Sequence, residues 1–207
     1  MPARDHIVTT MERLETLYGT PSGPAVAKEI DHINSGYRKL IEAAPFVTIA
    51  TSGPEGLDCS PKGDPAGFVR VLDEKTLAIP DRPGNNRLDG MRNLLRDPRI
   101  AVLFLIPGVG ETLRVNGRAD ISVDPQLMES FAMNGKLPRA IIVVHVERVY
   151  FHCSKAIVRS KLWDEATKID RKSLPSTGSI VAELSKGKLG GEAYDREMPE
   201  RIKAQLY

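Results

Sequence analysis

Two short segments of this 207-residue chain concentrate side chains that could bind an anion. Residues 60–64 offer a hydroxyl, an ammonium group and a glycine whose backbone allows close approach, and residues 81–87 combine two arginines with two asparagines just before a predicted helix. Guanidinium groups and the free N–H groups at the start of a helix are common phosphate ligands. The candidate binding residues are Ser60, Pro61, Lys62, Gly63, Asp64, Asp81, Arg82, Asn85, Asn86 and Arg87.

The same residue types also suit a turn with no ligand. Asp81, Asn85 and Asn86 are frequent turn and capping residues, and the neighbouring arginines could remain solvated. Phosphate binding and a structural turn therefore both remain open at this segment.

A third candidate segment, residues 152–163, follows the last predicted strand. It combines several cations with the only tryptophan, Trp163. An aromatic ring beside cations could lie against a planar, anionic ligand. The alternative is that Trp163 is a packing anchor and the cations form a solvated face.

The sequence gives less support for a metal site or for a catalytic nucleophile. His145 and His152 lie seven residues apart on one predicted strand, so their side chains should point to opposite faces. The two cysteines, Cys59 and Cys153, exclude a disulfide framework and a tetracysteine zinc site. We predict that both are buried thiols, with a Cys–His pair as the alternative. No GxGxxG, P-loop or HExxH motif occurs.

The first 44 residues are predicted to be helical. Thr9 and Glu12 fit a capping box, and Gly19 would end the helix. Residues 26–41 carry apolar side chains at a 3.6-residue period, which indicates one buried face. Gly36 suggests a kink there, or two successive helices.

From residue 46 the pattern becomes typical of strands. Residues 46–51 with 57–62, and 67–72 with 76–80, predict two hairpins, and longer strands are predicted at 99–106, 112–123 and 140–153. A bulge is expected at Gly117, and burial on both faces along the last strand. Short helices are predicted at 87–97 and, after an Asp124 cap, at 125–132. We expect one mainly β, helix-flanked antiparallel sheet of about six strands, as a closed or partly split barrel.

Composition narrows the function classes. The net charge is only +2, so a nucleic-acid partner is not expected. The N-terminus lacks the apolar segment of a secretory signal, and the longest apolar runs are far shorter than the roughly 20 residues of a membrane helix. We therefore expect a cytoplasmic protein without a membrane segment.

The order of three motifs resembles the pyridoxamine 5′-phosphate oxidase-related, FMN-binding split-barrel family. They are the ATS…G…SPKGD hairpin, the IPDRPGNNR turn and the DPRIAVLFLIPG strand. The segment FHCSKAIVRSKLW looks like that of one branch of uncharacterised members. The resemblance covers about residues 45–163, so we expect a helical extension at 1–44, the split barrel at 45–163 and a helix and loop tail at 164–207.

This resemblance implies a six-stranded split barrel that forms a homodimer with FMN between the subunits. Residues 60–64 would line the flavin ring, and the turn at 81–87 would hold the phosphate. Arg114 would lie near the flavin, where the oxidases place a glutamine. Lys161 and Trp163 would approach the flavin from the partner subunit.

The chain departs from the true oxidases at its C-terminal end, where it reads RIKAQLY and carries no Arg-x-His motif. Vitamin B6 oxidation is therefore not implied. We expect an FMN-dependent oxidoreductase that uses a nicotinamide donor, NAD(P)H, and an unidentified small molecule. The alternatives are a non-catalytic flavin-binding or sensor protein, and a binder of deazaflavin (F420) or haem on the same barrel.

Overall fold

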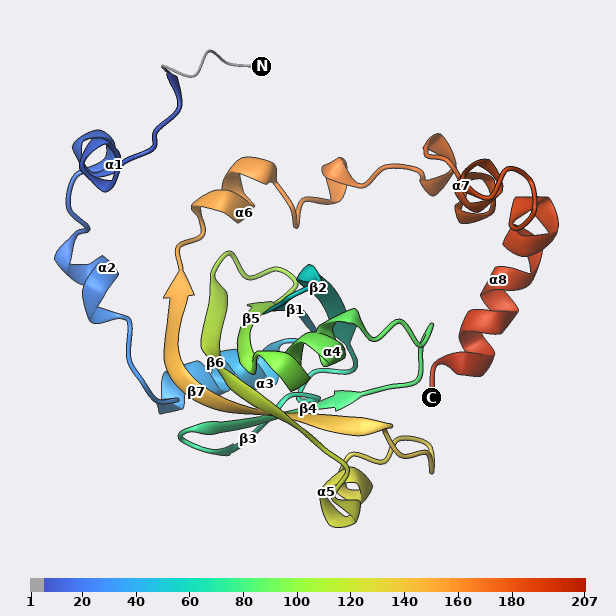
Figure 1. Ribbon diagram of the computed structural model, residues 1–207, viewed down its shortest axis with the longest axis horizontal. Helices are drawn as coiled ribbons and strands as arrows, with labels where there is room; N and C mark the ends of the chain where they lie inside the picture. Colours follow the sequence, from blue (N-terminus) through green and yellow to red (C-terminus); the bar gives the residue numbers. More distant parts are fainter. Residues whose placement is uncertain (1–5) are drawn as a thin grey trace.

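The fold is one antiparallel sheet of seven strands, in the order β2-β1-β5-β6-β7-β4-β3 (Figure 1). This computed structural model describes residues 6–207, so residues 1–5 of the predicted helical segment lie outside it. The strands are β1 (Phe46–Gly53), β2 (Gly56–Gly63), β3 (Arg70–Asp73), β4 (Thr76–Asp81), β5 (Arg99–Leu105), β6 (Thr112–Ser122) and β7 (Ala140–His152).

The predicted number of about six strands is wrong, because all seven predicted strand segments, including both members of the second hairpin, join one sheet. The short strand β3 pairs with β4, and β4 pairs with β7. β2 and β3 form the two edges of the sheet and do not pair with each other, so the barrel is open.

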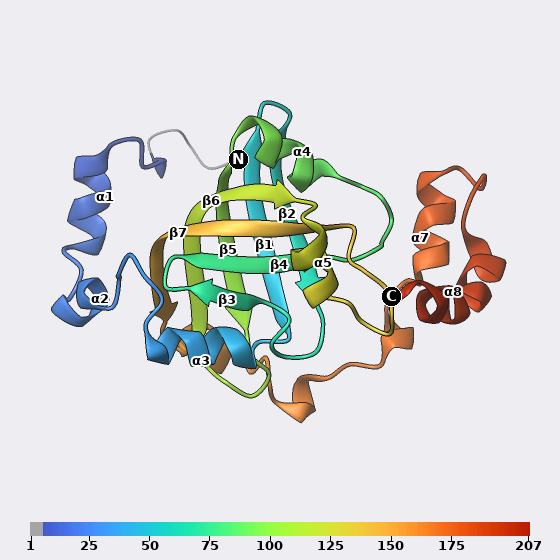
Figure 2. The same ribbon diagram turned by 90° about the horizontal axis from the view of Figure 1, so that it is seen from below.

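Helices flank the sheet at several places. Two of them, α1 (Met11–Tyr18) and α2 (Gly23–Ala27), lie on one side of the body, and α7 (Thr177–Leu184) with α8 (Gly191–Gln205) lies on the opposite side (Figure 2). The remaining helices are α3 (Ser35–Ala43), α4 (Asp89–Arg96), α5 (Pro125–Ser130) and α6 (Lys155–Ser160), with 3₁₀ turns at Glu165–Thr167 and Arg171–Ser173.

Of the two alternatives for residues 26–41, two successive helices are confirmed as α2 and α3, but the break lies before Ser35, and Gly36 lies inside α3. The chain between them pairs with β7 through Ile30 and Val149. The cap of α1 is Thr10 rather than Thr9, because Thr10 accepts the N–H of Arg13 at 3.3 Å. The predicted Asp124 cap of α5 is confirmed.

The core lies on the inward face of the curved sheet. Val47 and Ile49 of β1 point inward, opposite Phe104 and Val102 of β5, and all four are buried. α3 covers one end of this core with Tyr37 and Ile41, among other residues. The predicted burial of β7 on both faces holds only for its first residues.

The ladder is irregular at Gly117, as predicted, but the extra residue lies on the partner strand: Asn116 pairs with Arg148 and Gly117 with Val146, which leaves Glu147 of β7 unpaired. A Cβ at Gly117 would lie only 2.0 Å from the carbonyl oxygen of His145. Glycine is required here because the backbone of β7 approaches so closely.

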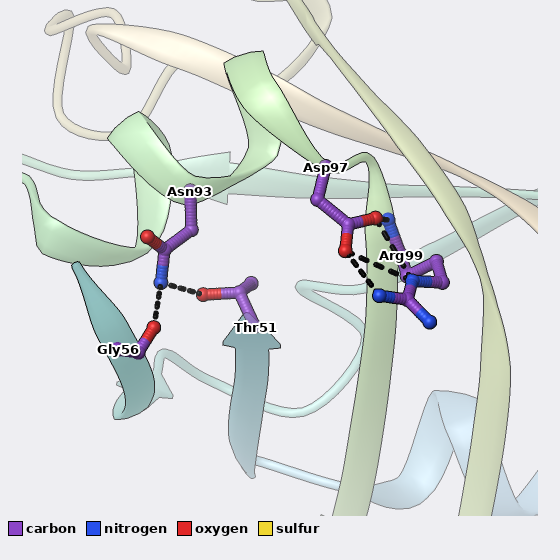
Figure 3. Close-up of polar contacts among 5 residues, drawn as sticks. All are labelled: Thr51, Gly56, Asn93, Asp97 and Arg99. Atoms are coloured by element: carbon purple, nitrogen blue, oxygen red, sulfur yellow. Dashed lines mark hydrogen bonds and ion pairs between the residues drawn. The ribbon is translucent and has the colours of Figure 1, made fainter. Parts of the chain in front are cut away.

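Asn93 fixes α4 on the β1–β2 hairpin (Figure 3). Its buried amide donates to Thr51 Oγ1 at 3.3 Å and to the carbonyl oxygen of Gly56 at 3.2 Å. After the helix, Asp97 binds the guanidinium of Arg99 at 2.5 Å, where the chain enters β5. Because α4 follows directly on residues 81–87, its docking also fixes the position of that segment.

We predict that Asn93→Ala lowers the free energy of unfolding by about 1–3 kcal/mol, because Thr51 and Gly56 lose a buried hydrogen-bond partner. Leu95→Ala is the matched control on the same helix, since Leu95 is 78% exposed, and it should be close to neutral. Urea unfolding measures both. Equal effects in the two variants would contradict this role of Asn93.

Candidate functional site

A cavity of about 410 Å³ opens between β2, the start of α4 and the loop that precedes it. Its floor is apolar and includes Ile49, Met91 and Ile142. A volume of this size lies within the range typical of small-molecule sites, roughly 300–1,000 Å³. The cavity therefore combines room for a planar ligand with polar groups on its wall.

The wall facing α4 is one side of β2. Asp58, Ser60 and Lys62 alternate along the strand and pair across it with inward-facing residues of β1. Ser60 donates to Asp58 at 2.9 Å, and Lys62 forms an ion pair with the buried Asp81. Two of the predicted residues, Ser60 and Lys62, thus lie in the cavity with their side chains already oriented.

The predicted phosphate turn forms the mouth of the cavity. Asn85 Oδ1 accepts the backbone N–H of Arg87 at 2.9 Å, and Asn86 adopts a left-handed backbone with φ of 59°. Arg87 is largely exposed and pairs with Asp89 at 2.5 Å, which raises the pKa of its guanidinium. The turn places these three side chains around one opening.

Arg82 differs from Arg87 because it is held inside the protein. Its Nε donates to Asp64 at 2.8 Å, and its Nη1 donates to the carbonyl oxygen of Phe131 at 2.8 Å. Both members of the Arg82–Asp64 pair are shielded, with side-chain exposures of 15% and 3%. An arginine has five N–H donors, so these two bonds leave donors for a ligand.

A second cavity of about 370 Å³ adjoins the first and shares Ser60, Lys62, Arg82 and Arg87 with it. It also contains Pro61, Gly63 and Asp64. All ten residues predicted from the two segments therefore line one or both of these cavities.

Sequence reasoning missed Thr51, Asp58 and Arg139, which line the first cavity as well. The alternation of Asp58 with Ser60 and Lys62 was a usable signal for Asp58. Arg139 gave no such signal, because it comes from the loop before β7 and reaches the site only through folding. Its backbone N–H donates to the carbonyl oxygen of Asp81 at 2.8 Å.

Arg114 lies elsewhere. It lines a cavity of about 650 Å³ together with Thr48, Ala50 and His152. Thr48 and Ala50 alternate along β1 with Ile49 and Thr51, which line the first cavity, so the two cavities lie on opposite faces of β1. Lys62 and Arg114 of one chain therefore do not share a cavity.

The last two predicted site residues, Lys161 and Trp163, line none of the three cavities described above. Lys161 is an exposed residue that ends α6 in a left-handed conformation. Trp163 is half-buried and donates its indole N–H to the carbonyl oxygen of Val109 at 2.7 Å. Within one chain Trp163 thus anchors the segment after α6 to the β5–β6 turn.

The prediction that both cysteines are buried is wrong, since Cys59 and Cys153 are free and exposed. Cys59 pairs with Ala50 across the β1–β2 ladder and so lies on the outward face of an edge strand. Cys153 follows the end of β7, beyond the buried part of that strand. His145 and His152 have different partners, Asp120 and Arg114.

Among residues 6–207, no helix is both long and apolar enough to cross a membrane. Within the same residues, no cluster of three or more His, Cys, Asp or Glu side chains is suited to hold a metal ion.

Comparison with known proteins identifies the family. The family model described as pyridoxamine 5′-phosphate oxidase matches residues 33–153, so the chain belongs to this family. The matched range contains α3, the whole sheet, and the cavity residues described above. No curated protein matches the chain.

Solved structures with a similar fold include HupZ from Group A Streptococcus. It is 21% identical, with a TM-score of 0.48, and the match covers 59% of this chain and 95% of HupZ. A pyridoxamine 5′-phosphate oxidase homologue from Lactobacillus delbrueckii is 19% identical, with a TM-score of 0.46 and coverages of 58% and 95%. An F420 reductase is 20% identical, with a TM-score of 0.41 and coverages of 58% and 98%.

The pKa of His152 is lowered by burial and by the nearby charges of Arg114 and Lys28. Its ordinary value is about 6.5, so on acidification the unfolded chain takes up the proton before the folded one does. We predict that the melting temperature of the wild type falls more steeply than that of His152→Gln as the pH drops through about 6.5 and below it.

The glutamine keeps an acceptor for Arg114, whose Nε donates to His152 at 3.2 Å. Thermal melts of both proteins across this pH range measure the difference. Parallel curves would contradict the prediction.

Proposed function

We propose that the protein binds FMN in the two adjoining cavities and acts as an oxidoreductase. The observation that supports this most is the arrangement of the site: an apolar floor and a polar β2 wall end at a turn rich in guanidinium and amide donors. FMN has the matching order of groups, with a planar ring at one end and a phosphate at the other. Membership of the pyridoxamine 5′-phosphate oxidase family favours the same ligand.

Each part of the site has a role in this proposal. Arg87 is free to swing toward a phosphate because its side chain is 79% exposed, and Asn86 holds the turn in the backbone conformation that brings it there. Lys62, fixed by Asp81, presents a cation beside the ring. Bound flavin would supply the hydride and electron chemistry, and the chain would supply orientation and charge.

We predict that Arg87→Ala weakens FMN binding about tenfold or more, since a charged hydrogen bond to phosphate contributes roughly 1.5–3 kcal/mol. Arg92→Ala is the matched control, because Arg92 is an exposed arginine of α4 that does not line either cavity. Quenching of flavin fluorescence measures both dissociation constants. Unchanged FMN affinity in Arg87→Ala would remove the turn from the site.

The position of Arg114 leads to a second part of the proposal, a homodimer. Arg114 can approach the flavin only if a partner subunit supplies it, because within one chain it lies on the opposite face of β1. The outward face around Arg114 is half-exposed and lined by Ala101, Leu103 and Leu105 among others. An apolar face of this kind, rimmed by cations, suits burial against a second copy.

Subunit mixing tests this arrangement. We predict that Arg87→Ala and Arg114→Ala each bind FMN weakly alone, but that a mixture recovers about a quarter of the wild-type sites after subunit exchange. Half of the dimers would then carry both substitutions in one site and neither in the other. Titration of the mixture with FMN measures the recovered sites, and no recovery would exclude a site shared between subunits.

The electron donor proposed for this site is NAD(P)H. Bleaching of the yellow FMN-loaded protein on addition of NAD(P)H under exclusion of air would support an oxidoreductase. Lack of bleaching with retained FMN would support a flavin-binding or sensor protein instead. The visible spectrum of the purified protein distinguishes both from a deazaflavin or haem protein.

A further inference from the structure

Tyr207 reaches back from the segment after α8 to the wall of the second cavity. Its hydroxyl donates to Asp64 Oδ1 at 2.7 Å, while Arg82 binds the other oxygen of the same carboxylate. The guanidinium carbon of Arg82 lies 5.6 Å from the centre of the Tyr207 ring. Lys136 additionally binds the carbonyl oxygen of Tyr207. Three contacts thus hold Tyr207, and two of them are with Asp64 and Arg82 beside the phosphate turn.

These contacts bear on the orientation of Arg82. Asp64 is 3% exposed and receives one donor on each oxygen, so its two bonds fix the plane of the carboxylate. That plane sets the direction of the guanidinium, because Nε is bound to Asp64 and Nη1 to the carbonyl oxygen of Phe131. Loss of the Tyr207 hydroxyl would leave a shielded carboxylate oxygen without its donor.

We propose that Tyr207 is a positioning residue for the phosphate end of the cavity. By holding Asp64, it keeps the remaining N–H donors of Arg82 directed at the anion. This inference rests on the proposed binding of FMN for its ligand, but the contact between the tail and the turn is testable without one.

The first experiment compares FMN with riboflavin, which has the same ring and no phosphate. Tyr207→Phe keeps the ring over Arg82 and removes only the hydroxyl. We expect its dissociation constant for FMN to rise about three- to tenfold, less than for the loss of a direct charged hydrogen bond because the hydroxyl acts on the phosphate only through Asp64 and Arg82, and its affinity for riboflavin to stay unchanged. Tyr194→Phe is the matched control on α8, because Tyr194 packs on Arg201 and does not contact the cavity wall.

Two outcomes of this titration would overturn the proposal. One is unchanged FMN affinity in Tyr207→Phe. The other is an equal loss of FMN and riboflavin affinity, which would indicate a general structural effect rather than one on the phosphate.

The second experiment uses hydrogen–deuterium exchange of the ligand-free protein. We expect Tyr207→Phe to increase exchange in the peptide covering residues 81–88, and Tyr194→Phe to leave it unchanged. If the wild type binds neither flavin, the proposed cofactor is wrong while increased exchange still supports the positioning role. Unaltered exchange at 81–88 would overturn that role.

Discussion

The alternation of side chains along β1 is the constraint on which the proposed site depends. Ile49 and Thr51 point to the cavity beside α4, and Thr48 and Ala50 point to the cavity that contains Arg114. One strand therefore forms a wall of two cavities on opposite faces, and a single chain cannot close them around the same ligand. The open edge of the sheet, with β2 and β3 unpaired to each other, leaves the first cavity accessible from outside.

Ion pairs determine how the cations of the site are oriented and how much net charge the site carries. Lys62 pairs with Asp81, Arg82 with Asp64, and Arg87 with Asp89, so each predicted cation of residues 60–64 and 81–87 has a carboxylate neighbour. Such pairs orient N–H donors and lower the net charge of the cavity. The Arg82–Asp64 pair is shielded from solvent, whereas Arg87 is exposed and free to rearrange. We infer that Arg82 provides fixed geometry and Arg87 provides adaptable charge.

Local sequence signals predicted much of the fold. The hairpins and the Asp124 cap depend on neighbouring residues, and the structure confirms them. The irregularity at Gly117 is also found, but its extra residue lies on the partner strand. The break between α2 and α3 lies at residues 28–34, where pairing of Ile30 with β7 replaces helical hydrogen bonds. The exposure of Cys59 was missed because it depends on which strand lies at the edge of the sheet, which no local pattern around Cys59 reveals.

The residues of the candidate site also differ in whether the local sequence could identify them. Residues 60–64 and 81–87 could be identified because residue type and spacing are local, and the ion pair between Arg82 and Asp64 joins the two segments. Arg139 and Tyr207 reach the site from distant parts of the chain. The backbone N–H of Arg139 donates to the carbonyl oxygen of Asp81, and the hydroxyl of Tyr207 donates to the carboxylate of Asp64. Both aspartates are already paired through their side chains with a predicted cation. The acidic residues of the two segments thus connect the recognisable motif to the rest of the protein.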